Sequence, residues 1–157
     1  MPLGGRNAGQ ELRRLQYVLY RTRGKFWVSW RSWSMLPDPP ITVLCIDDED
    51  DQLLLRKLLL EKEGYRVFTA TSGKEGIRLF QAEHIDLVIL DYWMSRMNGV
   101  LVARTLKALR SKIPIIMLSG YTGLPDEAIG TTDVWLIKSH VEPQELLAVV
   151  KDLLQRN

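Results

Sequence analysis

The chain has 157 residues, 46% of them hydrophobic and 25% charged, which suits one soluble globular domain with a sizeable core. No apolar run reaches the roughly 18 residues of a membrane span, and the short apolar stretch near the N-terminus lacks the features of a signal peptide. The single cysteine, Cys45, gives no sign of a disulfide framework or a zinc site and fits a reducing, cytoplasmic setting.

The formal net charge of +2 conceals a split between two segments. Residues 1–34 carry seven basic residues and one acid, which leaves 14 basic and 18 acidic residues for 35–157. We expect 1–39 to be a basic, poorly ordered extension, or upstream sequence if the true start is Met35. Nucleic-acid binding, membrane-surface binding and partner docking stay open as functions, because a helix would place three tryptophans on one face (Trp27, Trp30 and Trp33).

The pattern becomes regular after the helix-breaking PDPP at 37–40, so the folded domain is predicted over 40–157. Short apolar runs suited to buried parallel strands alternate there with amphipathic stretches suited to helices. The expected strands are 41–46, 65–70, 86–91, 113–118 and 133–138, and the expected long helices are 52–64, 72–81, 98–110 and 142–154. The glycine-rich stretch between the last two strands leaves room for only about two helical turns, so the fourth helix is expected to be short or irregular.

This alternation, repeated five times, predicts an α/β fold with a doubly wound, parallel five-stranded sheet between two helix layers. We expect the flavodoxin-like strand order, 2-1-3-4-5. Local signals support the helix ends: Gly64 is placed to end the first long helix and Pro143 to begin the last. Ser72 and Glu75 have the spacing of a capping box at the start of the second.

Polar side chains follow four of the five predicted strands at the point where each strand ends. Asp47 and Asp48 follow the first strand, Asp91 ends the third, Ser119 follows the fourth and Lys138 ends the fifth. Because open parallel sheets bind ligands beyond the carboxyl ends of their strands, we expect these five side chains to converge. Three neighbouring carboxylates require positive charge, which the lysine and a Mg²⁺ ion can supply.

The acidic string DDEDD has a simpler interpretation, a solvated helix start where acids favour the helix dipole. The three acids after Asp48 are expected in that first turn, but the convergence of four strand ends argues against this interpretation for the whole string. A carboxylate can attack phosphorus, and phosphoryl transfer needs mainly positioning and charge neutralisation. Because no strand end carries a dedicated general base, the set suits a site that accepts a phosphoryl group and holds it.

These residues closely resemble the receiver domain of two-component response regulators over about residues 40–155. The motifs that carry the resemblance are the pair Asp47-Asp48, LDYWMSRMNG around Asp91, Ser119-Gly120 and Lys138. The resemblance implies a cytoplasmic phosphorelay of the bacterial type, with a sensor histidine kinase or a phosphotransfer protein as phosphoryl donor. With no recognisable DNA-binding output domain, we expect a stand-alone receiver that changes conformation and signals to an unknown protein partner, with a weak homodimer as a further possibility.

The resemblance also assigns roles within the site. Asp91 is the expected phosphoacceptor, and Mg²⁺ is expected to bind directly to Asp48 and Asp91, to Asp47 mainly through water, and to the backbone carbonyl of Trp93. The phosphoryl group is expected to contact Ser119 and Lys138.

Further expected roles concern switching and water access. Ser119 and Trp135 occupy the family's switch positions, and Trp93 and Tyr121 occupy positions that govern access of water to the aspartyl-phosphate. The family's usual prolines are replaced by Ser95, four residues after the phosphoacceptor, and by Ser139, directly after the lysine. A trans peptide bond is therefore expected before Ser139, because a cis bond before a residue other than proline costs about 2.5–4 kcal/mol.

Two other functions compete with the receiver. A haloacid-dehalogenase-like phosphatase would need a second acid two residues after Asp91, where this chain has Trp93, so we expect a signalling domain and not an enzyme. A degenerate receiver that acts only as an interaction scaffold is disfavoured by the presence of all five key residues.

Overall fold

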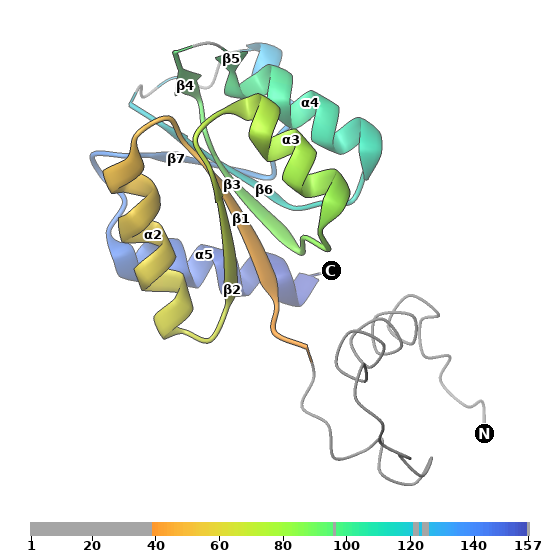
Figure 1. The fold of residues 1–157 in the computed structure, drawn as a ribbon. Helices are drawn as coiled ribbons and strands as arrows, with labels where there is room; N and C mark the ends of the chain where they lie inside the picture. Colours follow the sequence, from red (N-terminus) through yellow and green to blue (C-terminus); the bar gives the residue numbers. More distant parts are fainter. Residues whose placement is uncertain (1–38, 96, 121–122, 124–125, 157) are drawn as a thin grey trace, which may run out of the picture. The chain divides into compact units, whose positions relative to one another are not determined.

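The computed structural model describes residues 39–95, 97–120, 123 and 126–156 (Figure 1). The expected basic extension lies almost wholly outside these residues, so it stays a prediction. The strands are β1 (Thr42–Ile46), β2 (Arg66–Ala70), β3 (Leu87–Asp91), β4 (Trp93–Met94), β5 (Met97–Asn98), β6 (Ile115–Ser119) and β7 (Val134–Ile137). The helices are α2 (Asp50–Lys62), α3 (Gly73–Ala82), α4 (Gly99–Leu109) and α5 (Pro143–Arg156), with a 3-10 turn, η2 (Asp126–Ala128).

Five strands form one parallel sheet in the order β2-β1-β3-β6-β7. Since β6 and β7 are the fourth and fifth long strands of the chain, this is the predicted order 2-1-3-4-5. The three central strands, β1, β3 and β6, are buried along their whole length. Helices cover both faces of such a sheet, which is why these strands read as continuous apolar runs in the sequence.

The two faces of the sheet have separate hydrophobic cores. Figure 1 shows α2 and α5 on one face and α3 and α4 on the other. Leu53, Leu60 and Val150 pack with one side of the strands, and Phe80 and Leu106 belong to the core on the other side. Because both layers rest on the same strands, the strand ends are held rigidly from two sides.

Helix ends follow the predicted local chemistry with small differences. Gly64 has φ +87° directly after α2, a conformation that suits glycine, and Pro143 is the first residue of α5. The Ser72 side chain accepts the N–H of Glu75 at 3.3 Å, while the Glu75 carboxylate accepts the N–H of Thr71 and not of Ser72. Glu49 is the residue that caps α2, so only the last two of the three acids lie in its first turn.

Two features between the strands complete the fold. A short antiparallel hairpin, β4 with β5, follows β3 directly; the sequence did not predict it, because two-residue strands are too short to show a period. Between β6 and β7, the described residues contain only the three-residue turn η2, which confirms a short fourth helix. Within the described residues, no helix combines the length and apolarity needed to cross a bilayer.

Candidate functional site

The strand register brings the predicted site residues to one edge of the sheet. Ile46 lies opposite Leu90, so Asp47 and Asp91 occupy the next position of the two neighbouring strands. Carboxylate oxygens of Asp47, Asp48 and Asp91 all lie within 4.8 Å of one another. Ser119 is the buried last residue of β6, on the other side of β3. The predicted convergence is therefore observed for the three acids and for Lys138, while Ser119 is placed at the end of the neighbouring strand by its backbone.

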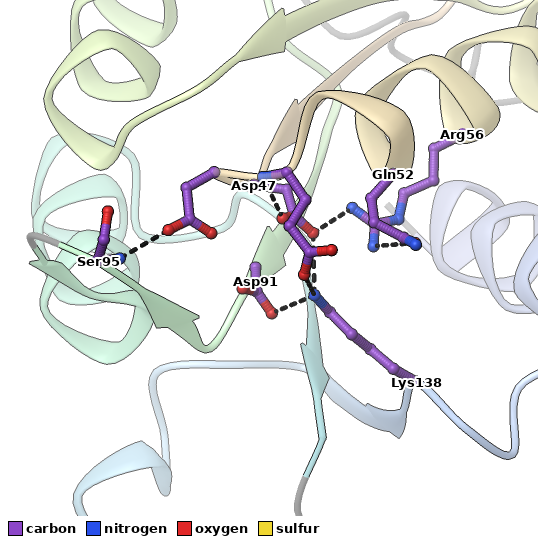
Figure 2. Close-up of polar contacts among 8 residues, drawn as sticks. Asp47, Gln52, Arg56, Asp91, Ser95 and Lys138 are labelled. Atoms are coloured by element: carbon purple, nitrogen blue, oxygen red, sulfur yellow. Dashed lines mark hydrogen bonds and ion pairs between the residues drawn. The ribbon is translucent and has the colours of Figure 1, made fainter.

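Lys138 joins the two buried carboxylates. Its Nζ lies 2.9 Å from Oδ1 of Asp91 and 3.1 Å from Oδ2 of Asp47 (Figure 2). Its backbone N–H donates to the carbonyl of Ser119 at 2.7 Å, which fixes the start of the side chain against β6. The bond before Ser139 is trans, as predicted, since the described residues contain no cis peptide. The lysine reaches the site with serine in the place of the family's usual proline.

Asp47 is fully buried and uses both carboxylate oxygens. Oδ1 accepts the N–H of Glu49 at 3.0 Å, and Oδ2 accepts Nη1 of Arg56 at 2.7 Å as well as Nζ of Lys138. Arg56 was missed by the sequence analysis. A signal for it exists, because Leu53, Arg56 and Leu60 form the buried face of α2, and an arginine in such a face needs a buried partner.

Asp48 is exposed and is held by Ser95, which lies between β4 and β5. The backbone N–H of Ser95 donates to its Oδ2 at 2.8 Å. This hydrogen bond is the first cause of a lowered Asp48 pKa. Proline has no N–H, so the bond depends on the replacement of the family's usual residue by Ser95.

Burial and charge set the protonation of the two groups at the centre. Burial raises the pKa of Asp91, as does the nearby charge of Asp47, while its hydrogen bond to Lys138 opposes the rise. Burial would lower the pKa of Lys138, but its contacts with Asp91 and Asp47 outweigh it and the pKa is raised. The ammonium therefore stays charged at neutral pH and steadies the carboxylate beside it.

The three carboxylates fit a hard divalent cation such as Mg²⁺, which prefers oxygen ligands. Asp47 is already bound by two cationic side chains, whereas among the described residues Asp91 pairs with Lys138 alone and Asp48 accepts a backbone N–H. This difference supports the expectation that Asp48 and Asp91 bind the metal directly and Asp47 does so through water. The roles themselves stay predictions.

Two of the expected switch and access residues, Trp93 and Trp135, have different surroundings. Trp93, in β4, is 67% exposed, and its predicted role as a carbonyl ligand stays a prediction. Trp135, in β7, is half-buried and its ring centroid lies 5.2 Å from that of Tyr92. Its indole N–H is buried without a hydrogen-bond partner in the described part of the chain. Tyr121 falls outside the described residues.

Gly99 is a further residue that the sequence analysis did not single out. A Cβ at this position would collide with the backbone oxygen of Asp91, and the N–H of Gly99 donates to the carbonyl of Tyr92 at 2.8 Å. The start of α4 can therefore lie against the end of β3 only because residue 99 has no side chain.

Comparison with known proteins identifies this arrangement. The family model described as the response regulator receiver domain matches residues 43–151. The chain is 32% identical over 120 residues to the transcriptional regulatory protein GlrR of Escherichia coli (strain K12), a match that covers 75% of this chain and 27% of that protein. The first curated relatives are longer, since the chain spans between 27% and 50% of their length.

Solved structures share the fold. A response regulator receiver domain protein (CheY-like) from Methanospirillum hungatei JF-1 aligns with a TM-score of 0.70 and 28% identity, over 75% of this chain and 96% of that one. The response regulator protein TrrA from Thermotoga maritima, in complex with Mg(2+)-BeF, aligns with a TM-score of 0.67 and 33% identity, over 72% of this chain and 98% of that one. The chain belongs to the response regulator receiver domain family, whose members are signalling domains of two-component systems.

Proposed function

We propose that Asp91 accepts a phosphoryl group, in a Mg²⁺-dependent reaction, from a phosphohistidine on a sensor histidine kinase or a phosphotransfer protein. The observation that carries this proposal is the position of Lys138, whose ammonium contacts both Asp91 and Asp47 at the strand ends, with Asp48 close by. We place this phosphorelay step in the cytoplasm.

The chemistry follows from the side chains present. An oxygen of the Asp91 carboxylate attacks phosphorus, the bond from phosphorus to the donor histidine breaks, and the imidazole leaves with the electron pair. Lys138 holds the carboxylate before transfer and offsets phosphoryl charge afterwards, and the Ser119 hydroxyl supplies a further hydrogen-bonding group. Bound Mg²⁺ would neutralise charge on the phosphoryl oxygens, with Asp48, Asp91 and the Trp93 carbonyl as ligands. A Mg(2+)-BeF complex of the related TrrA supports the choice of this metal.

The signal is proposed to leave the domain as a conformational change that a protein partner recognises. Ser119 would respond to the phosphoryl group, and Trp135, whose buried N–H has no partner in the described residues, would change its position in response. We assign Trp93 and Tyr121 to shielding of the aspartyl-phosphate from water. A phosphoryl half-life of seconds in the purified protein would contradict this shielding.

The direct test is incubation with Mg²⁺ and acetyl phosphate, followed by intact mass over time. The expected result is a gain of one phosphoryl group that needs Mg²⁺ and is absent from Asp91→Asn. A gain that persists in Asp91→Asn would show that another residue is the acceptor. No gain from acetyl phosphate or from any phosphohistidine donor, with Mg²⁺ still bound, would leave a receiver that acts as an interaction scaffold.

A further inference from the structure

The arginine on the buried face of α2 is unusual for its position. Arg56 is 5% exposed and lies between Leu53 and Leu60 along the side of the helix that packs on the sheet. Arginine is almost never buried without a partner, because removing its charge from water is costly. Its position therefore requires a strong interaction at the other end of the side chain.

That interaction is made inside the acidic site. Nη1 of Arg56 lies 2.7 Å from Oδ2 of Asp47, and Nη2 lies 3.4 Å from Oε1 of Gln52 (Figure 2). The same Oδ2 also accepts Nζ of Lys138 at 3.1 Å. One carboxylate oxygen thus holds two cations from two elements, α2 and the end of β7.

The second cation changes the charge of the site. Asp47, Asp48 and Asp91 contribute three negative charges when ionised, and Lys138 with Arg56 contributes two positive ones. A guanidinium stays protonated at all ordinary pH values, so this charge is permanent. Oε1 of Glu49 lies 3.8 Å from Nζ of Lys138. The Glu49 side chain is 65% exposed, so solvent screens its charge more strongly than the charges of the buried groups.

We propose that Arg56 is a built-in counter-ion of the acidic site. It neutralises part of the negative charge that a divalent cation would otherwise neutralise, and so it weakens the binding of that cation. The proposal rests on the proposed function only in taking the site to bind Mg²⁺. It makes Arg56 a positioning residue that acts through Asp47.

The effect is electrostatic, because the attraction of a cation to the site falls when the net negative charge of the site falls. Lys138 and the Glu49 N–H already satisfy Asp47, which means that burial of this acid does not by itself require the arginine.

The test compares Mg²⁺ affinity by isothermal titration calorimetry at constant ionic strength. Arg56→Gln removes the charge and keeps a polar side chain, Arg56→Lys keeps the charge, and Arg78→Gln removes an equal charge from an exposed position on α3, across the sheet from α2 (Figure 1). We expect Arg56→Gln to lower the Kd for Mg²⁺ by roughly tenfold, and the other two variants to stay close to the wild-type value.

Each other outcome decides against the inference. Equal Kd values for wild type and Arg56→Gln would overturn it and leave the proposed function intact. An equal gain in Arg56→Lys and Arg56→Gln would assign the effect to lost bond geometry and overturn the charge argument. Absence of Mg²⁺ binding in every protein would overturn the proposed function as well. If circular dichroism shows that Arg56→Gln is unfolded, Arg56→Met is measured in its place, because methionine fills the apolar face of α2. The same decrease in the Kd for Mg²⁺ is expected, and an unchanged Kd overturns the inference.

Discussion

Asp91 is a buried carboxylate whose charge is unfavourable in the folded, metal-free protein. Its pKa is raised mainly by burial, and this direction already includes the favourable contact with Lys138. For an acid with a raised folded pKa, the penalty is present above that pKa and disappears as the pH falls below the unfolded value of about 3.9. The ionised Asp91 therefore lowers the stability of the folded chain at neutral pH. A bound cation, or a phosphoryl group with its metal, would relieve this penalty.

Removal of this charge is expected to stabilise the metal-free chain. At pH 7 without Mg²⁺, Asp91→Asn should raise the free energy of unfolding, because the raised pKa of Asp91 means that its charge destabilises the folded state. Urea denaturation of both proteins between pH 7 and pH 4 measures this, and the difference should shrink as the pH falls. A less stable Asp91→Asn at pH 7 would mean that the contact with Lys138 outweighs burial.

The hydrogen bond from Ser95 to Asp48 gives a second prediction at this scale. Ser95→Pro removes the N–H that Asp48 accepts, whereas Ser95→Ala keeps it. We expect Ser95→Pro to raise the pKa of Asp48 and to destabilise the metal-free chain by about 1 kcal/mol, because a hydrogen bond to a charged group is lost. Carboxyl NMR titration and urea denaturation check both effects. Similar results for alanine and proline would show that the N–H is unimportant.

Among the elements, β3, the hairpin and the start of α4 meet in a closely packed junction. The N–H of Tyr92 donates to the carbonyl of Leu118 at 2.8 Å, and the carbonyl of Tyr92 accepts the N–H of Gly99. The Asn98 side chain caps α4 by accepting the N–H of Val100 at 2.8 Å. Asp91, the proposed phosphoacceptor, thus lies at the end of a strand whose following segment is fixed to both a neighbouring strand and a helix start.

Gly99→Ala is expected to disturb this junction. The new Cβ would meet backbone atoms of Asp91 and Tyr92, which cannot move as a flexible side chain can. A loss of about 2 kcal/mol or more in unfolding free energy is expected, with slower phosphorylation from acetyl phosphate. Gly120→Ala is the control for stability, because its Cβ would meet no heavy atom of the described residues within 4 Å, apart from its own chain neighbours. Equal stability of the two variants would contradict the close approach.

For the whole molecule, the position of the acidic cluster would couple the proposed metal binding to folding. Asp47 and Asp48 directly follow β1 and Asp91 ends β3, so the cluster exists only when the sheet is formed. A ligand that binds the folded state alone stabilises it in proportion to the logarithm of its concentration.

Mg²⁺ is therefore expected to raise the Tm of the wild-type chain. At 100 times its Kd, the stabilisation should be about 2.7 kcal/mol. Differential scanning calorimetry over a Mg²⁺ series measures the shift, with Asp48→Asn as the variant that should lose most of it. An unchanged wild-type Tm across the series would contradict a metal site formed by folding.

The sequence by itself determined the five long strands and their order in the sheet, the long helices and the five polar residues at the strand ends, but not the short hairpin of β4 and β5. Those features are encoded locally, by the period of apolar residues, by glycine, serine and proline at helix ends, and by the rule that parallel strands present their carboxyl ends together. The short η2 followed from the glycine-rich stretch in the same way.

Only the tertiary structure decided which polar groups contact one another. Asp48 meets the N–H of Ser95 across 47 positions, and Lys138 meets Asp47 across 91. The contact between Arg56 and Asp47 spans only nine positions, but it forms only when Arg56 lies on the buried face of α2. Such contacts depend on distances set by packing between elements, and residue type and spacing do not contain those distances. The charge balance of the site is therefore set by the packing of the fold.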